Sequence, residues 1–418
     1  MTNCVILDAC RIPFTKSDGA YKKLSAVDLG VRCTTALMER SPLPPEKLDG
    51  LIAGNVGSPC DSANIARVIG LFSNLPETLP AHTVARNCAS GIEAVTTAVE
   101  KIRAGSGNVF LAVTTESMTQ YPLLMGPQLT NFFKKLGKAR SLVQKISIIS
   151  SFRPGFLTPR ITLLEGLKDP SNGMMMGDTA DLIARDWDIS REEQDQYALQ
   201  SHLRALEAQE KKLFDDELIP VFTPEGKVIS QDDGPRQGQS IESLRKLRPV
   251  FDRRYGTVTV GNACGITDGA AALLIASKKS AEKNGWPILA GIKGFAWTGC
   301  DPKRMGLGPV SASTALLHKQ KLSFDDMDVV ELNEAFSAQV LGCLRSFEDS
   351  KKVGVPTIEK LNPQGGAIAL GHPVGATGGR MILSVAKQLE RQQLKYGLAT
   401  LCIGGGQGGA ILLENPHV

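Results

Sequence analysis

The sequence has few histidines, few aromatic residues and no long apolar run. Only 5 of its 418 residues are histidine, and Phe, Trp and Tyr together make up 5%. No uninterrupted apolar stretch reaches the roughly 20 residues that a membrane-spanning helix needs, so we do not expect a transmembrane protein. The net charge is only +4, from 47 basic and 43 acidic residues. Overall charge therefore gives no indication of nucleic-acid binding.

The nine cysteines lack the spacings of a metal site or a disulfide framework. No CxxC pair occurs among them, so the sequence predicts no metal ligands and favours a reducing compartment. The first residues, MTNCVILDACRIPF, run directly into a predicted strand without the features of a signal peptide or an Arg/Ser-rich leader. We therefore expect a cytoplasmic protein.

The chain is long enough for two or three hydrophobic cores. Residues 3–9 and 108–114 have the pattern of short buried strands, and residues 89–103 between them have apolar positions at helical spacing. The same order returns late in the chain, where a predicted helix over 378–393 precedes a strand over 397–402. We interpret this as an internal duplication of an α/β unit.

A different kind of segment separates the two halves. From Ser117 to Leu164 the sequence has no acidic residue but seven basic ones. Within it, residues 131–150 place apolar side chains on one helical face and lysines opposite. The Gly- and Asp-rich residues 230–240 are predicted to form a surface loop. We take 119–252 as an inserted loop domain.

Cys88, in RNCASGIEAV, is a candidate nucleophile. It lies just before a predicted helix, where free backbone N–H groups and the helix dipole favour a thiolate. The alternative is a small apolar side chain that fills the corner between strand and helix. This segment alone does not decide between them.

His372, in GHPVGATGGR, is a candidate base. Gly371 removes side-chain bulk before it, and Pro373 fixes the backbone after it. An imidazole held there could accept a thiol proton or donate a hydrogen bond to a substrate oxygen. A structural histidine at a helix start is the alternative.

Two further segments complete the set of candidates. Cys402 ends a predicted strand in LCIGGGQGGA, where five glycines in seven residues expose backbone N–H groups and leave the thiol open to a ligand. Asn333 stands at the predicted start of an amphipathic helix in ELNEAFSAQV. Its amide either caps that helix or fixes a water molecule in a pocket.

In this order, the segments resemble those of the thiolase family. The resemblance extends over essentially the whole chain, through LDACRIPF, NCASG, MGDTAD, KLRPVFD, GNACGITDGAAALL, NEAF, GHPVGATGGR and CIGGGQGGA. It implies an α/β thiolase fold, with two topologically equivalent halves stacked as a five-layered αβαβα sandwich. The N-terminal half would be 1–118 with 253–279, the C-terminal half 280–418, and the CoA-binding loop domain 119–252, with a basic amphipathic insertion over 128–165.

The resemblance also implies a 3-ketoacyl-CoA thiolase of fatty-acid β-oxidation, with CoA as substrate and no permanently bound cofactor. Cys88 would form the acyl-enzyme, and His372 would activate it and contribute to an oxyanion hole. Cys402 would be the acid/base at the acetyl group. Asn333 would hold a water in the first oxyanion hole, and the backbone N–H groups of Cys88 and Gly404 would form the second.

Contacts with CoA follow from the same resemblance. Arg236 stands twelve residues before Arg248 of KLRP, as does the nucleotide-contacting arginine of the family. Cys264 replaces a serine that bonds the pantetheine arm, and a thiol is a weaker hydrogen-bonding group. Met175 and Met176 stand where acetoacetyl-specific relatives carry a histidine, which indicates a different acyl preference.

The basic insertion resembles that of the thiolase subunit of the fatty-acid oxidation trifunctional enzyme. This implies a homodimer or dimer of dimers, a hydratase/dehydrogenase partner subunit and peripheral contact of 128–165 with a membrane. The insertion could instead cover its own active site or a subunit interface. Two other functions stay open: a biosynthetic acetoacetyl-CoA thiolase, and a thiolase-like carrier or scaffold without turnover.

Overall fold

The computed structural model describes residues 3–418, which form two compact units. The larger unit consists of residues 3–120 and Asp169–Val418, and the smaller one of Tyr121–Lys168. The larger unit is built on a ten-stranded mixed sheet with the order β12-β13-β14-β11-β1-β10-β5-β3-β4, and β2 pairs with β10 at its side. The strands are β1 (Cys4–Arg11), β2 (Thr15–Lys16), β3 (Gly50–Gly54), β4 (Ala81–Val84), β5 (Val109–Ser117), β10 (Thr267–Ser277), β11 (Ala290–Gly299), β12 (Val329–Leu332), β13 (Tyr396–Ile403) and β14 (Gln407–Glu414).

The sheet contains the same strand arrangement twice. In the first half, β3 runs parallel to β5, followed by antiparallel β10 and β1. In the second half, β12 runs parallel to β13, followed by antiparallel β14 and β11. An antiparallel pairing of β1 with β11, in which Cys4 faces Ile292, joins the two. The duplication predicted from the sequence is therefore confirmed at the level of topology.

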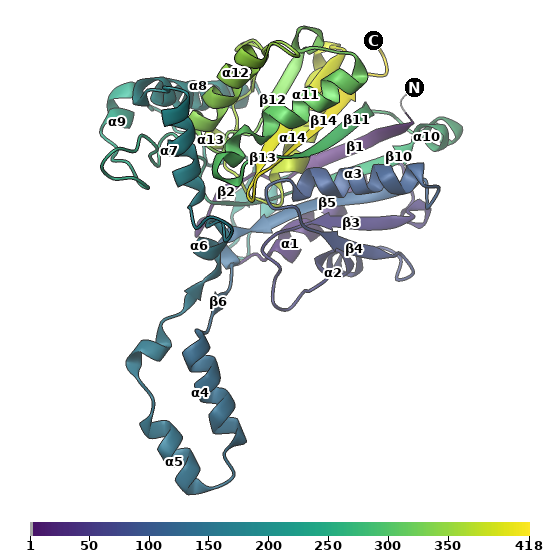
Figure 1. Cartoon of the computed structure of the whole chain (residues 1–418). Helices are drawn as coiled ribbons and strands as arrows, with labels where there is room; N and C mark the ends of the chain where they lie inside the picture. The colour runs from purple at the N-terminus through teal and green to yellow at the C-terminus, as the bar shows by residue number, and fades with distance from the viewer. Residues whose placement is uncertain (1–2) are drawn as a thin grey trace. The chain divides into compact units, whose positions relative to one another are not determined.

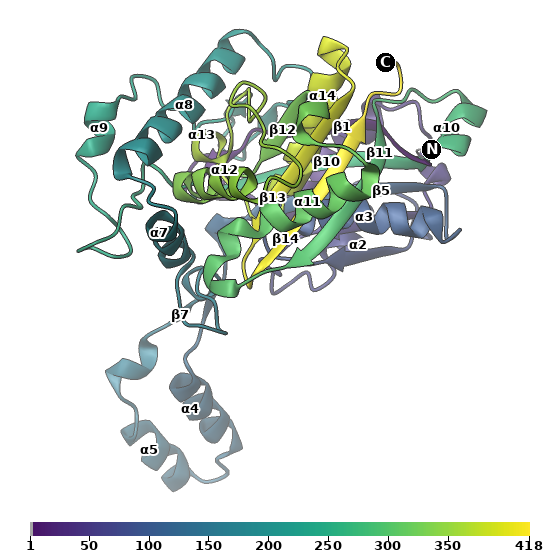
Figure 2. The same ribbon diagram turned by 45° about the horizontal axis from the view of Figure 1, so that its top comes forward.

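Helices cover both faces of each half and complete the layers. Helices α3 and α14 pack against each other and against strands of both halves, and they form the middle layer. Helices α1 and α2 cover the outer face of the first half, and α11 with α12 that of the second (Figures 1 and 2). The predicted five-layered α/β sandwich is confirmed.

The helices have these bounds: α1 (Ala26–Arg40), α2 (Ile65–Phe72), α3 (Ser90–Arg103), α7 (Met176–Asp186), α8 (Arg191–Glu210), α9 (Ile241–Arg245), α10 (Lys278–Asn284), α11 (Gly308–Gln320), α12 (Ser337–Ser350), α13 (Ala367–Leu370) and α14 (Thr377–Gln392). Short 3₁₀ helices are η1 (Pro45–Lys47), η2 (Met118–Gln120), η4 (Pro302–Leu307) and η5 (Phe324–Asp326), and the short strands β8 (Val221–Phe222) and β9 (Val228–Ile229) form a separate pair.

Glycines allow the two central helices to approach closely at their first turns. A Cβ atom on Gly91 of α3 would lie 2.7 Å from the backbone nitrogen of Gly379 in α14, nearer than real Cβ contacts come. Only glycine fits at such a crossing. Cys88 lies two residues before α3 and His372 five residues before α14, so this contact brings both segments to the same place.

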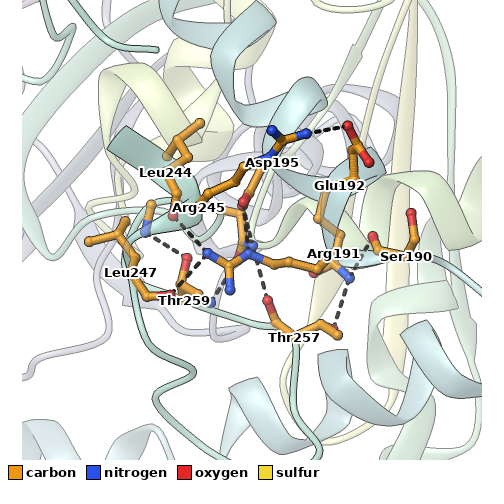
Figure 3. A network of polar contacts seen from close by, with 12 residues as sticks. Ser190, Arg191, Glu192, Asp195, Leu244, Arg245, Leu247, Thr257 and Thr259 are labelled. Carbon is orange, nitrogen blue, oxygen red and sulfur yellow. Dashed lines mark hydrogen bonds and ion pairs between the residues drawn. The ribbon is translucent and has the colours of Figure 1, made fainter. Parts of the chain in front are cut away.

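Two ion-pair networks involve residues of the larger unit between β5 and β10, and the first of them reaches the sheet. Arg11 of β1 is fully buried and bonds Asp232 through two nitrogens, at 2.7 and 2.8 Å. The prediction that 230–240 is wholly a surface loop is therefore wrong at Asp232, because this carboxylate neutralises a buried guanidinium. Arg191 of α8 bonds Asp195 at 2.8 Å and the carbonyl of Leu244 at 2.7 Å (Figure 3). The predicted boundaries of the two halves and the loop domain stay predictions.

The smaller unit is a pair of helices held by a cluster of phenylalanines. Its elements are β6 (Leu123–Leu124), α4 (Pro127–Lys138), α5 (Leu142–Ser150), η3 (Pro154–Leu157), β7 (Arg160–Ile161) and α6 (Thr162–Gly166). The rings of Phe132, Phe152 and Phe156 contact one another at centroid distances of 5.4 to 6.4 Å. The single helix predicted over 131–150 is broken, because Ser141 caps a new helix through reciprocal bonds with Gln144.

Much of the apolar surface of the smaller unit is open. Leu142 and Val143 are 74% and 77% exposed, and Ile146 and Ile149 are more than half exposed. The part of the chain that the structure describes has no helix with the length and apolarity needed to cross a bilayer.

Candidate active site

The predicted catalytic residues lie on four connecting segments and one strand end. Cys88 lies between β4 and α3, His372 between α13 and α14, Asn333 directly after β12, Cys402 near the end of β13, and Gly404 in the turn before β14. These elements belong to both halves of the sheet. Sequence positions more than 300 residues apart must therefore meet if the predicted site exists.

A hydrogen bond joins the Cys88 segment to the turn after Cys402. The side-chain amide of Asn87 donates to the carbonyl of Gly404 at 2.8 Å. Asn87 itself has a left-handed backbone, with φ of 45°, a conformation that asparagine tolerates better than most residues. Cys88 is next to Asn87 in sequence, and Cys402 is two residues before Gly404, so this hydrogen bond holds the segments of both cysteines together.

Backbone hydrogen bonds bring the other segments to the same region. The N–H of His372 donates to the carbonyl of Gly265 at 3.3 Å, and the N–H of Cys264 donates to the carbonyl of Ala335 at 3.1 Å. Ala335 lies two residues after Asn333 in sequence. The structure therefore places the segments of His372, Cys264 and Asn333 side by side.

Burial keeps the clustered thiols protonated. It raises the pKa of Cys402 well above its ordinary value, and neighbouring Cys88 raises it further because two thiolates would repel. Burial likewise raises the pKa of Cys264 to about 12, with Cys88 again adding to the effect. Cys88 therefore acts on the pKa of both Cys264 and Cys402.

The Cys88 thiol is also less acidic than the sequence indicates. Burial raises its pKa, while hydrogen bonds from the backbone N–H groups of Gly404 and of Cys88 itself lower it and the charge of Glu116 raises it. The predicted preference for a thiolate at this helix start is therefore wrong, because burial outweighs the N–H groups. The two N–H groups that act on the sulfur are those predicted for the second oxyanion hole.

Hydrogen bonds fix the tautomer of His372. Its Nδ1 lies 2.6 Å from Oγ1 of Thr377, and that hydroxyl donates its own hydrogen to the carbonyl of Pro373 at 3.0 Å. The hydroxyl must then accept from Nδ1, so Nδ1 carries the proton and Nε2 has the lone pair. Nε2 is buried and has no hydrogen-bond partner among residues 3–418.

The imidazole of His372 is neutral at neutral pH. Burial and, to a smaller extent, the nearby positive charge of Arg380 lower its pKa to about 4. A neutral imidazole with a free Nε2 can accept a proton from a thiol. The alternative of a purely structural histidine leaves this buried nitrogen unexplained.

Asn333 is buried without using its side chain in the fold. It is 1% exposed, yet neither its amide oxygen nor its amide nitrogen has a partner within the described residues. The alternative that it caps the following helix is wrong, since α12 begins at Ser337 with Phe336 at the cap position. A buried, unsatisfied amide is expensive unless it binds water or a ligand.

The residues predicted to contact CoA lie at the edges of this region. The side chain of Arg236 is exposed, and its backbone N–H donates to Nδ1 of the buried His202 at 3.3 Å. Cys264 is half-buried beside the other thiols. The sulfur of Met176 lies 3.3 Å from where a Cβ atom on Gly404 would stand. The position expected to distinguish acetoacetyl-specific relatives is therefore apolar and next to the site.

Two residues that contact the segment of His372 were missed in the sequence. Thr377 sets the tautomer of His372 but was indistinguishable from other helix-start threonines. Glu116 is fully buried at the end of β5, beside the segment of His372. Its signal was one charged residue in the otherwise uncharged strand VFLAVTTES, since a carboxylate is seldom fully buried unless it is paired.

Comparison with known proteins supports the same assignment. The family model for the thiolase N-terminal domain matches residues 4–279, and that for the thiolase C-terminal domain matches residues 286–415. The mitochondrial trifunctional enzyme subunit beta of Bos taurus is 38% identical over 423 residues, covering 99% of this chain and 88% of that protein. A probable acetyl-CoA acyltransferase of Staphylococcus aureus is also 38% identical, covering 99% of both.

A solved structure agrees with these sequence matches. The crystal structure of human mitochondrial 3-ketoacyl-CoA thiolase in complex with CoA superposes with a TM-score of 0.88 at 35% identity, covering 99% of this chain and 98% of that one. Motifs, duplicated topology, both family models and full-length relatives all agree. The chain belongs to the thiolase family and is an acyltransferase.

Proposed function

We propose that Cys88, His372 and Cys402 carry out the thiolase reaction of this chain. A 3-ketoacyl-CoA is cleaved by CoA into acetyl-CoA and an acyl-CoA shortened by two carbons, as fatty-acid β-oxidation requires. One observation carries the proposal: the segments of two thiols from opposite halves are held together beside a neutral imidazole whose Nε2 is free.

In the first half-reaction, Nε2 of His372 takes the proton of the Cys88 thiol, and the sulfur attacks the keto carbon of the substrate. The bond between the keto carbon and the α-carbon then breaks, and its electron pair leaves as the enolate of acetyl-CoA. Cys402 donates its proton to that enolate, and the acyl group remains on Cys88 as a thioester. A thiol with a raised pKa suits this role, because it remains protonated until a stronger base forms.

In the second half-reaction, the Cys402 thiolate takes the proton of incoming CoA, and the CoA sulfur attacks the thioester. The shortened acyl-CoA leaves, and the imidazolium of His372 returns its proton to Cys88. Each negative oxygen needs fixed donors. We assign the backbone N–H groups of Cys88 and Gly404 to the thioester oxygen, and His372 with a water on Asn333 to the enolate oxygen.

The pH dependence of acylation tests this proton transfer. The reaction needs a neutral His372 and a protonated Cys88, and the two pKa shifts widen the range in which both exist. We expect the rate of acyl-enzyme formation from acetyl-CoA to stay flat down to about pH 5 and to fall only near the pKa of His372. A stopped-flow pH profile measures this. A decline that begins near the ordinary histidine pKa would contradict the neutral pair.

Acyl chain length separates this function from its alternatives. We expect 3-ketohexadecanoyl-CoA to leave a tetradecanoyl group on Cys88, because Met176 makes the acyl side of the site apolar. Intact-protein mass spectrometry after brief exposure, followed by peptide mapping, identifies both group and residue. Labelling by acetyl-CoA alone would favour the biosynthetic acetoacetyl-CoA thiolase, and no labelling by either would favour a carrier or scaffold.

We also propose that the smaller unit mediates peripheral membrane contact of a cytoplasmic protein. Its side chains Leu142, Val143, Ile146 and Ile149 are exposed, and the surrounding sequence contributes seven basic residues against none that are acidic from Ser117 to Leu164. Lysines near an anionic surface contribute about 1 kcal/mol each, and apolar side chains add by insertion. The mitochondrial relative is named as a subunit of a trifunctional enzyme. We therefore also propose that this chain binds a hydratase/dehydrogenase partner subunit and forms a homodimer or a dimer of dimers.

Vesicle binding tests the membrane contact. We expect phosphatidylserine vesicles to sediment the protein at low salt and to release most of it at high salt, since screening weakens the charge term. Uncharged phosphatidylcholine vesicles are the control. Replacing both Val143 and Ile146 by serine should reduce binding about tenfold without changing thiolysis. Equal binding to both vesicle types, or none, would contradict the proposal.

A further inference from the structure

Glu116 occupies an unusual position for a carboxylate. It lies at the end of β5, fully buried, in a strand whose other residues are mostly apolar. Within residues 3–418, four N–H donors bond it: the side-chain amide of Asn55 at 3.0 Å and the backbone of Gly57 at 3.0 Å bond Oε1, while the backbone of Val56 at 3.0 Å and of Gly375 at 2.9 Å bond Oε2. Both oxygens are therefore used, and each accepts two hydrogen bonds.

One of these donors belongs to the segment that holds the catalytic base. Gly375 lies three residues after His372 and two before Thr377. The contact is tight: a Cβ atom on Gly375 would lie 2.6 Å from Oε2 of Glu116 and 2.9 Å from the carbonyl oxygen of Thr115. Glycine is needed here for space, so the backbone rests directly on the carboxylate.

Only a carboxylate satisfies this set of donors. An amide has one oxygen, so in either orientation its NH₂ group would face two N–H donors and leave them without acceptors. A buried donor without a partner is costly, and hydrogen bonds to a charged acceptor are stronger than those to a neutral one. Three of the donors lie in the segment that follows β3, and the fourth, Gly375, lies in the segment between α13 and α14. Glu116 therefore connects the first half of the molecule to the segment of the second half that contains His372.

We propose that Glu116 is a positioning residue for acyl transfer: its bond to Gly375 fixes the backbone between Pro373 and Thr377, and so keeps Nε2 of His372 aligned with the Cys88 thiol. The inference rests on the proposed function, in which His372 is the base for Cys88. Thr377 orients the imidazole ring, and Glu116 holds the backbone from which both side chains extend.

The charge of Glu116 and its positioning role have opposite effects on Cys88. The negative charge raises the pKa of the Cys88 thiol, so removing the charge alone would make this thiol more reactive at neutral pH. Losing the alignment of Nε2 would make it less reactive, because no base would assist. The titratable groups that interact with the Cys88 thiol are Glu116 on β5, Cys264 before β10 and Cys402 on β13. The segment of His372 bonds the carbonyl of Gly265, next to Cys264.

The test is the rate at which iodoacetamide alkylates Cys88, followed by peptide mass spectrometry in the intact chain. In Glu116→Gln we expect iodoacetamide to alkylate Cys88 at least about tenfold more slowly at neutral pH than in the wild type. The rate of Cys88 acylation by acetyl-CoA should fall about 100-fold, while KM for CoA should change less than about threefold. At high pH, where the thiol ionises without help, alkylation rates of variant and wild type should converge.

A second variant tests the same contact with the charge kept. Gly375→Ala forces the backbone off Oε2 but leaves Glu116 its other three donors, and we expect it to slow alkylation in the same direction. Asp328→Asn is the matched control, because its carboxylate oxygen also accepts two backbone N–H groups, from Lys395 at 2.8 Å and Tyr396 at 3.0 Å. These groups lie at the starts of β12 and β13, whereas Asn333 and Cys402 lie at the other ends of these strands. In Asp328→Asn, iodoacetamide should alkylate Cys88 at the wild-type rate.

The outcomes separate this inference from the proposed function. Faster or unchanged alkylation in Glu116→Gln, or a wild-type rate in Gly375→Ala, would overturn the positioning role. If Glu116→Gln does not fold, Gly375→Ala decides alone. Wild-type protein that forms no acyl-enzyme on Cys88 would overturn the proposed function itself, whatever the variants do.

Discussion

Cys88→Ala is expected to abolish the acyl-enzyme and to reduce thiolysis by about 10⁴-fold or more, since removal of a catalytic nucleophile typically costs this much. Alanine has no atom that can hold the acyl group between the two half-reactions. Cys264 and Cys402 lie close by, and burial raises the pKa of all three thiols, but the backbone N–H groups of Gly404 and position 88 offset this rise at the Cys88 sulfur. Neither neighbour can therefore replace it.

Intact-protein mass spectrometry after exposure to a 3-ketoacyl-CoA measures this result directly. Cys264→Ser is a matched control, because it removes a second thiol from the same cluster and restores the hydroxyl that the family often has there. We expect it to keep the Cys88 adduct and to change KM for CoA by no more than a few-fold. An acyl group that persists in Cys88→Ala, mapped to Cys264 or Cys402, would show that the nucleophile has been assigned wrongly.

Catalytic candidates were predictable where a reactive side chain stood among glycines. Cys88, His372 and Cys402 each lie in a segment with little other side-chain chemistry, and their order along the chain matches one family. The duplicated α/β unit followed from the repeated order of strand and helix, and the five-layered sandwich followed from the resemblance of the motifs to the thiolase family. Both inferences use local patterns, which a sequence displays directly.

Properties that depend on burial were not predictable in this way. The helix start at Cys88 indicated a thiolate, but the surrounding protein raises the pKa of the thiol, and only the structure shows that environment. Glu116 and Gly375 are 259 residues apart, and although Gly375 lies within GHPVGATGGR, Glu116 belongs to none of the motifs. The helix break at Ser141 depends on a capping box that a continuous apolar pattern had obscured.

Cys402→Ala is expected to slow carbon–carbon bond formation far more than it slows the acylation of Cys88. Acylation of Cys88 by acetyl-CoA needs only the thiol, the base and the oxyanion donors, so its rate should stay within about tenfold of wild type. Carbon–carbon bond formation also needs a proton removed from the acetyl group, and here the rate should fall by about 10³-fold or more, near the upper range for loss of a general acid or base. His372 cannot take over, because it already serves Cys88.

Exchange of the acetyl-CoA methyl hydrogens with deuterated water isolates that proton transfer from every other step. We expect Cys402→Ala to form the acetyl-enzyme on Cys88 and yet to show almost no exchange. Cys343→Ala is the matched control, since Cys343 is another buried thiol that acts on the pKa of Cys402 but has its own bond to the carbonyl of Gly306. It should exchange like the wild type. Undiminished exchange in Cys402→Ala would mean that another group removes the proton, and the raised pKa of Cys402 would then reflect burial alone.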